Sequence, residues 1–172
     1  MTTDEITQLI QQYANDCGID PGIAVAQAQK ESQLNPNAFN PNDPGGGAKG
    51  LMQFTSPAWA QWGAGSFDNA FDIYANLNAW CAYMQWLLAR YNGDYTKALQ
   101  AYNGGPRGVD NGIVSPAAQA YAAAIVPAFS GGATIAAGNG GGGGNGGGAP
   151  SSMPAWLIVG AIGLAAVLFM RD

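Results

Sequence analysis

The chain contains no histidine and few charged side chains. Of its 172 residues, six are lysine or arginine and eleven are aspartate or glutamate, giving a formal net charge of −5. Without histidine the chain cannot build a Ser–His or Cys–His nucleophile, and it lacks the commonest metal ligand. The basic residues form no run, which argues against a nucleic-acid partner. We therefore expect no metal or other cofactor, and acid–base chemistry must use carboxylates, tyrosine, lysine or cysteine.

Cysteine is also scarce. Cys17 and Cys81 are the only two, and their separation does not match the spacing of a metal site. One long-range disulfide is a possible arrangement. We favour two buried thiols instead, because a free cysteine packs as a small hydrophobic side chain.

The composition divides the chain into three regions. Residues 1–129 mix apolar and polar side chains as a globular domain does. Residues 130–152 are mostly glycine with alanine, asparagine and serine, and ordering them would cost conformational entropy with little surface to bury. We expect this stretch to be a disordered, flexible linker.

Residues 153–172 contain an apolar run from Ala155 to Met170. As a helix this run would be roughly 24 Å long, somewhat short for a bilayer core of about 30 Å. A helix that is apolar on every side has no face to present to water, so we predict a C-terminal transmembrane anchor rather than a core helix. The N-terminal residues do not form a basic stretch followed by an apolar one, so we expect no secretory signal.

Helix signals dominate residues 1–129, and the alternation typical of strands is nearly absent. Thr2 and Glu5 form a capping-box pattern, Asp20-Pro21 and Ser115-Pro116 are helix starts, and Asp68 is placed to cap the longest helix. We expect the Asn-, Pro- and Gly-rich stretch from residue 35 to 49 to be a loop. The sequence thus predicts an all-α domain whose helices cover approximately residues 2–16, 21–32, 56–62, 68–91, 94–102 and 115–126.

Glu31 is one of only two glutamates, and it falls at the C-terminal end of a mostly apolar predicted helix. Desolvation by apolar neighbours and the negative end of the helix dipole would both raise its pKa. A carboxylic acid that keeps its proton near neutral pH is the general acid that glycosidic cleavage requires. Glu31 is therefore our candidate catalytic residue.

Three further segments follow Glu31-Ser32 in a distinctive order. They are Asn35-Pro36-Asn37-Ala38, then Gly50-Leu51-Met52-Gln53, and finally Ala101-Tyr102-Asn103-Gly104-Gly105. On these motifs the sequence resembles the lytic transglycosylases, the lysozyme-like family that includes soluble lytic transglycosylases and goose-type lysozyme. The resemblance spans about residues 6–126 and implies a lysozyme-like fold.

The resemblance implies a peptidoglycan lyase. Glu31 would protonate the oxygen leaving N-acetylmuramic acid, and the C6 hydroxyl of that sugar would close a 1,6-anhydro ring. Ser32, Gln53, Tyr102 and Asn103 would bind substrate, with the Tyr102 hydroxyl placed to orient Glu31 and Gln53 contacting the sugar or fixing its turn. Asn40 stands where the family often has a serine near the acetamido group.

Two alternatives remain open. One is a hydrolytic muramidase that uses Asp43 or Asp110 as a second carboxylate. The other is a catalytically idle, wall-binding or structural membrane protein of a virion. An anchor without a signal leaves the domain on the cytosolic side, so we expect a bacteriophage enzyme held in the internal membrane of the virion, with the lipid bilayer and other virion proteins as partners, that acts on the host wall at genome entry or lysis.

Overall fold

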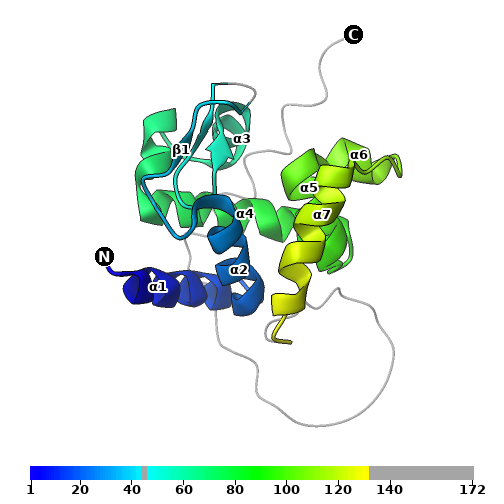
Figure 1. Cartoon of the computed structure of the whole chain (residues 1–172), viewed down its shortest axis with the longest axis horizontal. Coiled ribbons are helices and arrows are strands. Elements are labelled where there is room, and N and C mark those ends of the chain that lie inside the picture. The colour runs from blue at the N-terminus through cyan, green and yellow to red at the C-terminus, as the bar shows by residue number, and fades with distance from the viewer. Residues whose placement is uncertain (44–45, 132–172) are drawn as a thin grey trace, which may run out of the picture. The chain divides into compact units, whose positions relative to one another are not determined.

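The computed structural model describes residues 1–43 and 46–131. Helices make up most of this part of the chain (Figure 1). The predicted anchor at 153–172, and the predicted linker apart from Ser130 and Gly131, lie outside the described residues. Among the helices that are described, none has the length and apolar character needed to span a bilayer.

The helix-rich prediction for the globular region is confirmed. Apart from the helix placed at residues 68–91, the predicted helices begin within a residue or so of their expected starts. The α-helices are α1 (Thr3–Asp16), α2 (Pro21–Ser32), α3 (Ser56–Trp62), α4 (Ile73–Arg90), α5 (Tyr95–Gly104), α6 (Pro106–Asp110) and α7 (Pro116–Ile125), with short 3-10 helices η1 (Phe67–Phe71) and η2 (Val126–Ala128).

The predicted caps of the first two helices are confirmed. The Thr2 hydroxyl accepts from the Glu5 N–H, and the Glu5 carboxylate accepts from the Thr2 N–H. Asp20 caps α2 by accepting from the N–H groups of Gly22 and Ile23. Although burial opposes the ionisation of Asp20, these bonds and those from Ser130 lower its pKa. The start of α2 is thereby tied to the chain that follows η2.

The prediction that Asp68 caps the longest helix is wrong. Asp68 lies in η1, and its carboxylate pairs with the Lys49 ammonium at 2.6 Å. Helix α4 begins only at Ile73, where Asp72 accepts from the Ala75 N–H at 2.8 Å. Two aspartates four residues apart offer equivalent capping side chains, and the tight turn of η1 decides between them.

The predicted loop at residues 35–49 contains strands. β1 (Phe39–Asn40), β2 (Ala48–Lys49) and β3 (Phe54–Thr55) form an antiparallel sheet in the order β1-β2-β3. Phe39 pairs with Lys49, and Lys49 pairs with Phe54. Strands of two residues are too short to show an alternating pattern, which explains why the sequence did not reveal them.

Helix α4 lies between two groups of elements. The strands and α3 lie on one side of it, and α5, α6 and α7 gather on the other (Figure 1). The apolar face of α4 forms part of the core, because Leu77, Trp80, Met84 and Leu87 are fully buried. The central helix therefore supports both sides of the molecule.

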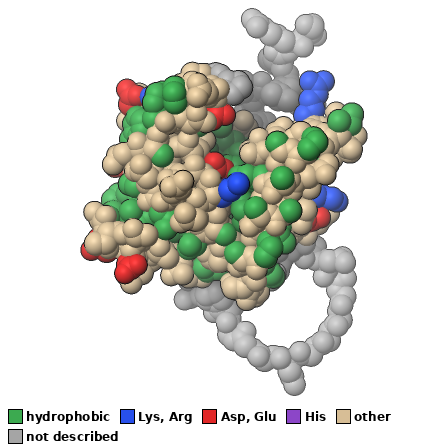
Figure 2. Space-filling view, viewed as in Figure 1, with side chains coloured by type: hydrophobic (Ala, Val, Ile, Leu, Met, Phe, Trp, Pro, Cys, Tyr) green, Lys and Arg blue, Asp and Glu red, His purple; other side chains and the backbone are tan. Residues whose placement is uncertain are grey.

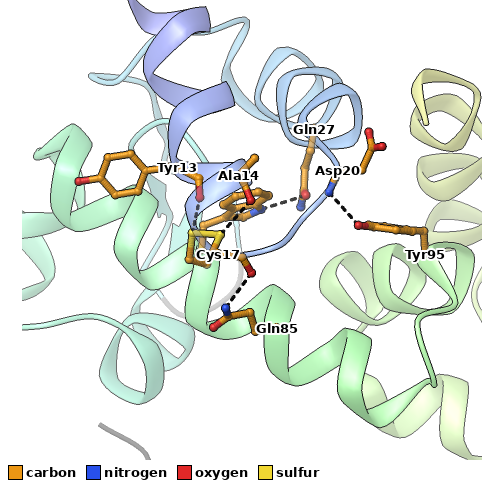
Figure 3. The surroundings of a disulfide bond; sticks show 9 residues. Tyr13, Ala14, Cys17, Asp20, Gln27, Gln85 and Tyr95 are labelled. Atoms are coloured by element: carbon orange, nitrogen blue, oxygen red, sulfur yellow. Dashed lines mark hydrogen bonds between the residues drawn. A yellow bond between two sulfur atoms is a disulfide. The ribbon is translucent and has the colours of Figure 1, made fainter. Parts of the chain in front are cut away.

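The two cysteines form a disulfide, so our preference for two free thiols is wrong. Cys17, at the C-terminal end of α1, is bonded to Cys81 in α4 (Figure 3). Nearby, the Gln85 side-chain amide donates to the Cys17 carbonyl at 2.8 Å. Both cysteines are buried, as the thiol interpretation required, but burial alone does not distinguish a thiol from a disulfide.

Candidate active site

Glu31 lies in the last turn of α2, with its side chain partly buried. Desolvation is the largest influence and raises the pKa of Glu31 from an ordinary 4.5 to about 7. The negative charge of Asp43 raises the pKa further, whereas a hydrogen bond from Tyr121 and the charge of Lys30 lower it. A substantial fraction of the protein therefore carries a protonated Glu31 at neutral pH.

Tyr121 of α7 is the hydrogen-bond partner of this acid. Its hydroxyl donates to Glu31 Oε1 at 2.5 Å, across a separation of 90 residues. Burial raises the pKa of Tyr121, and the charge of Glu31 raises it further, so the phenol keeps its proton. A protonated phenol fixes one carboxyl oxygen and leaves the other available to substrate.

Sequence reasoning missed Tyr121, although a signal was present. The buried residues of α7 are otherwise Ala118, Ala122 and Ile125, so the phenol is the polar group in an apolar stripe. A buried tyrosine hydroxyl usually needs a hydrogen-bond partner. That requirement points to a polar contact, although it does not identify Glu31 as the partner.

Gln27 lies one turn before Glu31 in α2 and supports Tyr121. Its side chain is fully buried, and its Oε1 accepts from the Trp80 indole N–H at 3.0 Å. The Gln27 amide acts against the raised pKa of Tyr121, so it lies beside that hydroxyl. However, Gln27 Nε2 has no partner with full hydrogen-bond geometry among the described residues.

The Tyr102 hydroxyl has a different partner from the one expected. It donates to the Met52 carbonyl at 2.7 Å, whereas the hydroxyl that contacts Glu31 belongs to Tyr121. Burial, followed by the charge of Glu31, raises the pKa of Tyr102, so its hydroxyl lies within electrostatic reach of the acid. Tyr102 thus connects α5 to the turn that carries Met52.

The turn from Gly50 to Gln53 is held from several directions. Gln53 Nε2 donates to the Gly50 carbonyl at 2.8 Å and to the Ala38 carbonyl at 3.2 Å. Of the two roles considered for Gln53, its contacts within the chain correspond to fixing the turn. Gly50 has a φ of +79°, and a Cβ there would collide with the Ala70 carbonyl and the side-chain amide of Asn76. Only glycine fits this position without strain.

Asn76 anchors the same turn to α4. It is fully buried, and its Oδ1 accepts from the Met52 N–H at 2.9 Å while its Nδ2 donates to the Ala70 carbonyl at 2.8 Å. Met52 and Phe54 are themselves buried and pack in the core. The turn is therefore a rigid wall beside Tyr102.

The other predicted binding residues differ in exposure. The buried Ser32 hydroxyl donates to the Ala28 carbonyl and accepts from the Asn35 N–H, so it ends α2 locally. Asn40 is exposed, and its Nδ2 donates to Asp43 at 2.6 Å. Asn103 is exposed in the last turn of α5.

The tryptophans of the described domain fall into two classes. Trp59 and Trp80 are core residues, and their indole N–H groups donate to Ser66 and Gln27 respectively. Trp62 is partly exposed and Trp86 is 37% exposed. Trp62 and Trp86 therefore keep part of their ring surface open, whereas Trp59 and Trp80 do not.

The face of the molecule that Figure 2 shows contains a hollow. It separates the surface over the strands from the surface over α5 to α7, and hydrophobic side chains form part of its floor (Figure 2). A helix-rich domain that holds a buried carboxyl group of raised pKa, with a tyrosine as its hydrogen-bond partner, belongs to the class of proteins equipped for general acid catalysis. The lysozyme-like arrangement expected from the motifs is of this class.

The comparisons assign the family. A model described as the transglycosylase SLT domain matches residues 8–125, and the chain belongs to this family. Among solved structures it is similar to the Escherichia coli 70 kDa soluble lytic transglycosylase SLT70, with 25% identity and a TM-score of 0.55 over 72% of this chain. It also shares the fold of an inactive mutant of the lytic transglycosylase Slt from Pseudomonas aeruginosa, with 19% identity and a TM-score of 0.58 over 70% of this chain.

Both similar structures belong to much longer chains. The matched region covers 20% of the Escherichia coli chain and 23% of the Pseudomonas aeruginosa chain. The similarity therefore concerns one domain of those proteins.

Proposed function

We propose that this protein is a peptidoglycan lytic transglycosylase that cleaves the β-1,4 bond between N-acetylmuramic acid and N-acetylglucosamine. The observation that carries the proposal is the position and state of Glu31. It has a pKa of about 7 and a tyrosine partner, in a domain of the transglycosylase SLT family. A pKa near the working pH suits a group that must first give a proton and then take one.

The reaction needs one carboxyl group in two roles. Glu31 gives its proton to the glycosidic oxygen as the bond from that oxygen to C1 of N-acetylmuramic acid breaks. The C6 hydroxyl of the same sugar then attacks C1, and its proton passes to the Glu31 carboxylate. The products are a 1,6-anhydro end and a free hydroxyl on the departing sugar, and no water is consumed.

The hydrogen bond from Tyr121 favours Glu31 after it has given its proton to the glycosidic oxygen more than it favours the protonated acid. The tyrosine hydroxyl donates to Glu31 Oε1, and such a bond favours the ionised carboxylate. Burial of the same carboxyl favours the protonated form. The opposing effects keep both protonation states of Glu31 accessible near neutral pH.

Product analysis tests the proposal. Purified peptidoglycan digested with the full chain is expected to yield fragments with anhydro ends, separable by mass from fragments with reducing ends. Glu31→Gln should yield neither while retaining the wild-type circular dichroism spectrum. Intact glycan after treatment with folded wild-type protein would instead support the idle, wall-binding interpretation.

A hydrolytic muramidase is the second candidate, because Asp43 lies near enough to Glu31 for its charge to raise the pKa of that group. A second carboxylate at this place could activate water. Asp110 is less suited, because its carboxylate already binds Arg90 and the Tyr91 hydroxyl.

Asp43→Asn separates the two reactions. A hydrolase would lose its activity, because the substitution removes the carboxylate that activates water. A lyase would continue to form anhydro ends, and its activity would decline at a lower pH, because the removed negative charge no longer raises the pKa of Glu31.

We further propose that the enzyme acts from a bacteriophage virion. This proposal rests on the apolar segment at 153–172 and the glycine-rich stretch before it, which would tether the catalytic domain to the virion's internal membrane. Recovery of the protein with purified phage particles, and its release by detergent, would support this setting. Recovery only from the host periplasm would contradict it.

A further inference from the structure

Four aromatic side chains form a continuous series from the catalytic residue outward. Tyr102, Tyr83, Trp62 and Trp86 come from α5, α4, α3 and α4, and we call them the aromatic strip. The Tyr102 and Tyr83 ring centroids are 5.2 Å apart, and those of Tyr83 and Trp62 are 5.1 Å apart with planes inclined by 22°. Trp86 lies 5.5 Å from Trp62 and 6.3 Å from Tyr83.

The strip begins beside Glu31 and ends at the surface. The charge of Glu31 acts on the Tyr102 phenol, which places that end near the acid. The outer end is the most exposed, because Tyr102, Tyr83 and Trp62 are partly buried whereas Trp86 is 37% exposed. Large aromatic side chains left open in a connected patch usually mark a contact surface.

The hydrogen bonding of the strip differs from that of the core tryptophans. Trp59 and Trp80 both donate their indole N–H to an acceptor in the protein. Trp62 and Trp86 have no such acceptor among residues 1–43 and 46–131. The outer strip therefore combines apolar ring surface with two donors that a ligand can use.

The charges around the strip favour an uncharged ligand. The Arg90 guanidinium lies over the Trp86 ring, 5.2 Å from its centre, so a cation already covers part of one face of that ring. Arg90 is in turn paired with Asp110 through two hydrogen bonds of 3.1 and 2.6 Å. Its charge is thus matched within the protein and is poorly placed to select an anion.

We propose that the aromatic strip is a carbohydrate subsite that holds an N-acetylhexosamine ring of the glycan strand away from the cleaved bond. A pyranose ring suits it because its C–H face packs on an aromatic face while its hydroxyl oxygens accept from indole N–H groups. This inference rests on the proposed function, since a glycan held along the strip continues from the bond at Glu31.

Kinetics on uncrosslinked glycan strands test the subsite. Trp86→Ala in the full chain is expected to raise KM roughly tenfold, because the aromatic face that packs on the sugar is lost, with kcat changed less than twofold. Trp86→Tyr should recover most of the loss. Tyr74→Ala is the matched control, because Tyr74 is a 51% exposed aromatic of the same helix outside the strip. An unchanged KM for folded Trp86→Ala would overturn the proposal.

A binding measurement leaves the strip intact and does not depend on turnover. The full chain carrying Glu31→Gln is titrated with N-acetylglucosamine tetramer while its indole N–H signals are followed by NMR. The Trp62 and Trp86 signals should shift and saturate, whereas those of buried Trp59 and Trp80 should stay nearly fixed. Saturable shifts that leave both strip tryptophans unmoved would refute the subsite, as would no binding.

The two arms separate the subsite from the proposed function. Wild-type protein that leaves glycan intact would defeat the lyase proposal, and the NMR titration would still decide whether the strip binds sugar. Active wild-type protein with an unresponsive strip would defeat the subsite alone.

Discussion

At the scale of single residues, the same burial that prepares Glu31 for catalysis costs stability. Its pKa is about 7 in the folded protein and about 4.5 when exposed. Between these values the folded state binds more protons than the unfolded state, so stability falls as the pH rises. The contribution of Glu31 to the free energy of unfolding is therefore lowest at the pH values where Glu31 is ionised.

Glu31→Gln should remove this pH dependence. A shift of this size corresponds to at most about 3 kcal/mol, lost by the wild type between about pH 4.5 and 7. We expect the variant to gain stability relative to the wild type over that range and to keep a constant advantage above it. Urea denaturation at pH 4.5, 6 and 8 measures the difference. Equal pH slopes for the two proteins would show that the Glu31 pKa is ordinary.

Tyr121→Phe tests the hydrogen bond to the acid. Because this bond lowers the pKa of Glu31, its loss should raise that pKa and move the high-pH decline of kcat/KM to higher pH. We also expect kcat to fall roughly ten- to a hundredfold, since removing one hydrogen bond to a charged group costs about 1.5–3 kcal/mol.

Tyr102→Phe is the control for this change. It removes the bond to the Met52 carbonyl and leaves the Tyr121–Glu31 bond in place. Its pH profile should therefore keep the wild-type midpoint even if its activity falls. A shift of the same size in both variants would indicate a general loosening of the site.

At the scale of elements, the helices were predictable because their signals are local. Thr2, Asp20 and Ser115 each cap the helix that the sequence assigns to them. The start of α4 was misplaced because Asp68 and Asp72 carry the same local signal, and only the turn in η1 separates them. The sheet escaped prediction because its strands are too short for a period.

The candidate site divides in the same way. Glu31 and the Gly50–Gln53 turn belong to short motifs that can be read along the chain. The Tyr121–Glu31 bond and the Asn76–Met52 bond join residues 90 and 24 positions apart. No local pattern encodes such contacts, since they depend on how α7 and α4 pack.

The disulfide is the clearest element-scale contribution to stability. It joins α1 to α4 across 64 residues, and closing a loop of that size stabilises the fold by about 4 kcal/mol in the chain-entropy model. We expect Cys17→Ser, Cys81→Ser and the double variant to lose similar amounts, because removing either sulfur breaks the bond. Urea denaturation of all three measures this.

Thiol titration of the unfolded wild type provides the control. Without a reductant it should detect no thiol in residues 1–131, and with a reductant it should detect two. Two reactive thiols without reductant, together with unequal effects of the single serine variants, would contradict the bond.

At the scale of the whole molecule, the described domain closes on itself at the first residue of the glycine-rich stretch. Ser130 donates its N–H and hydroxyl to the buried Asp20 carboxylate at the start of α2. The described residues thus end at a fixed point on the domain. A chain cut after Gly131 keeps that contact and should fold as the full chain does.

This cut tests the proposed anchor. We expect the full chain to float with vesicles of neutral phospholipid in a density gradient, because residues 155–170 supply a continuous apolar run. Residues 1–131 should stay in the aqueous fractions and release the same soluble fragments from purified peptidoglycan. Neutral lipid matters because a chain with a net charge of −5 gains no attraction to anionic headgroups. Flotation of both proteins, or of neither, would reject an anchor in the C-terminal segment.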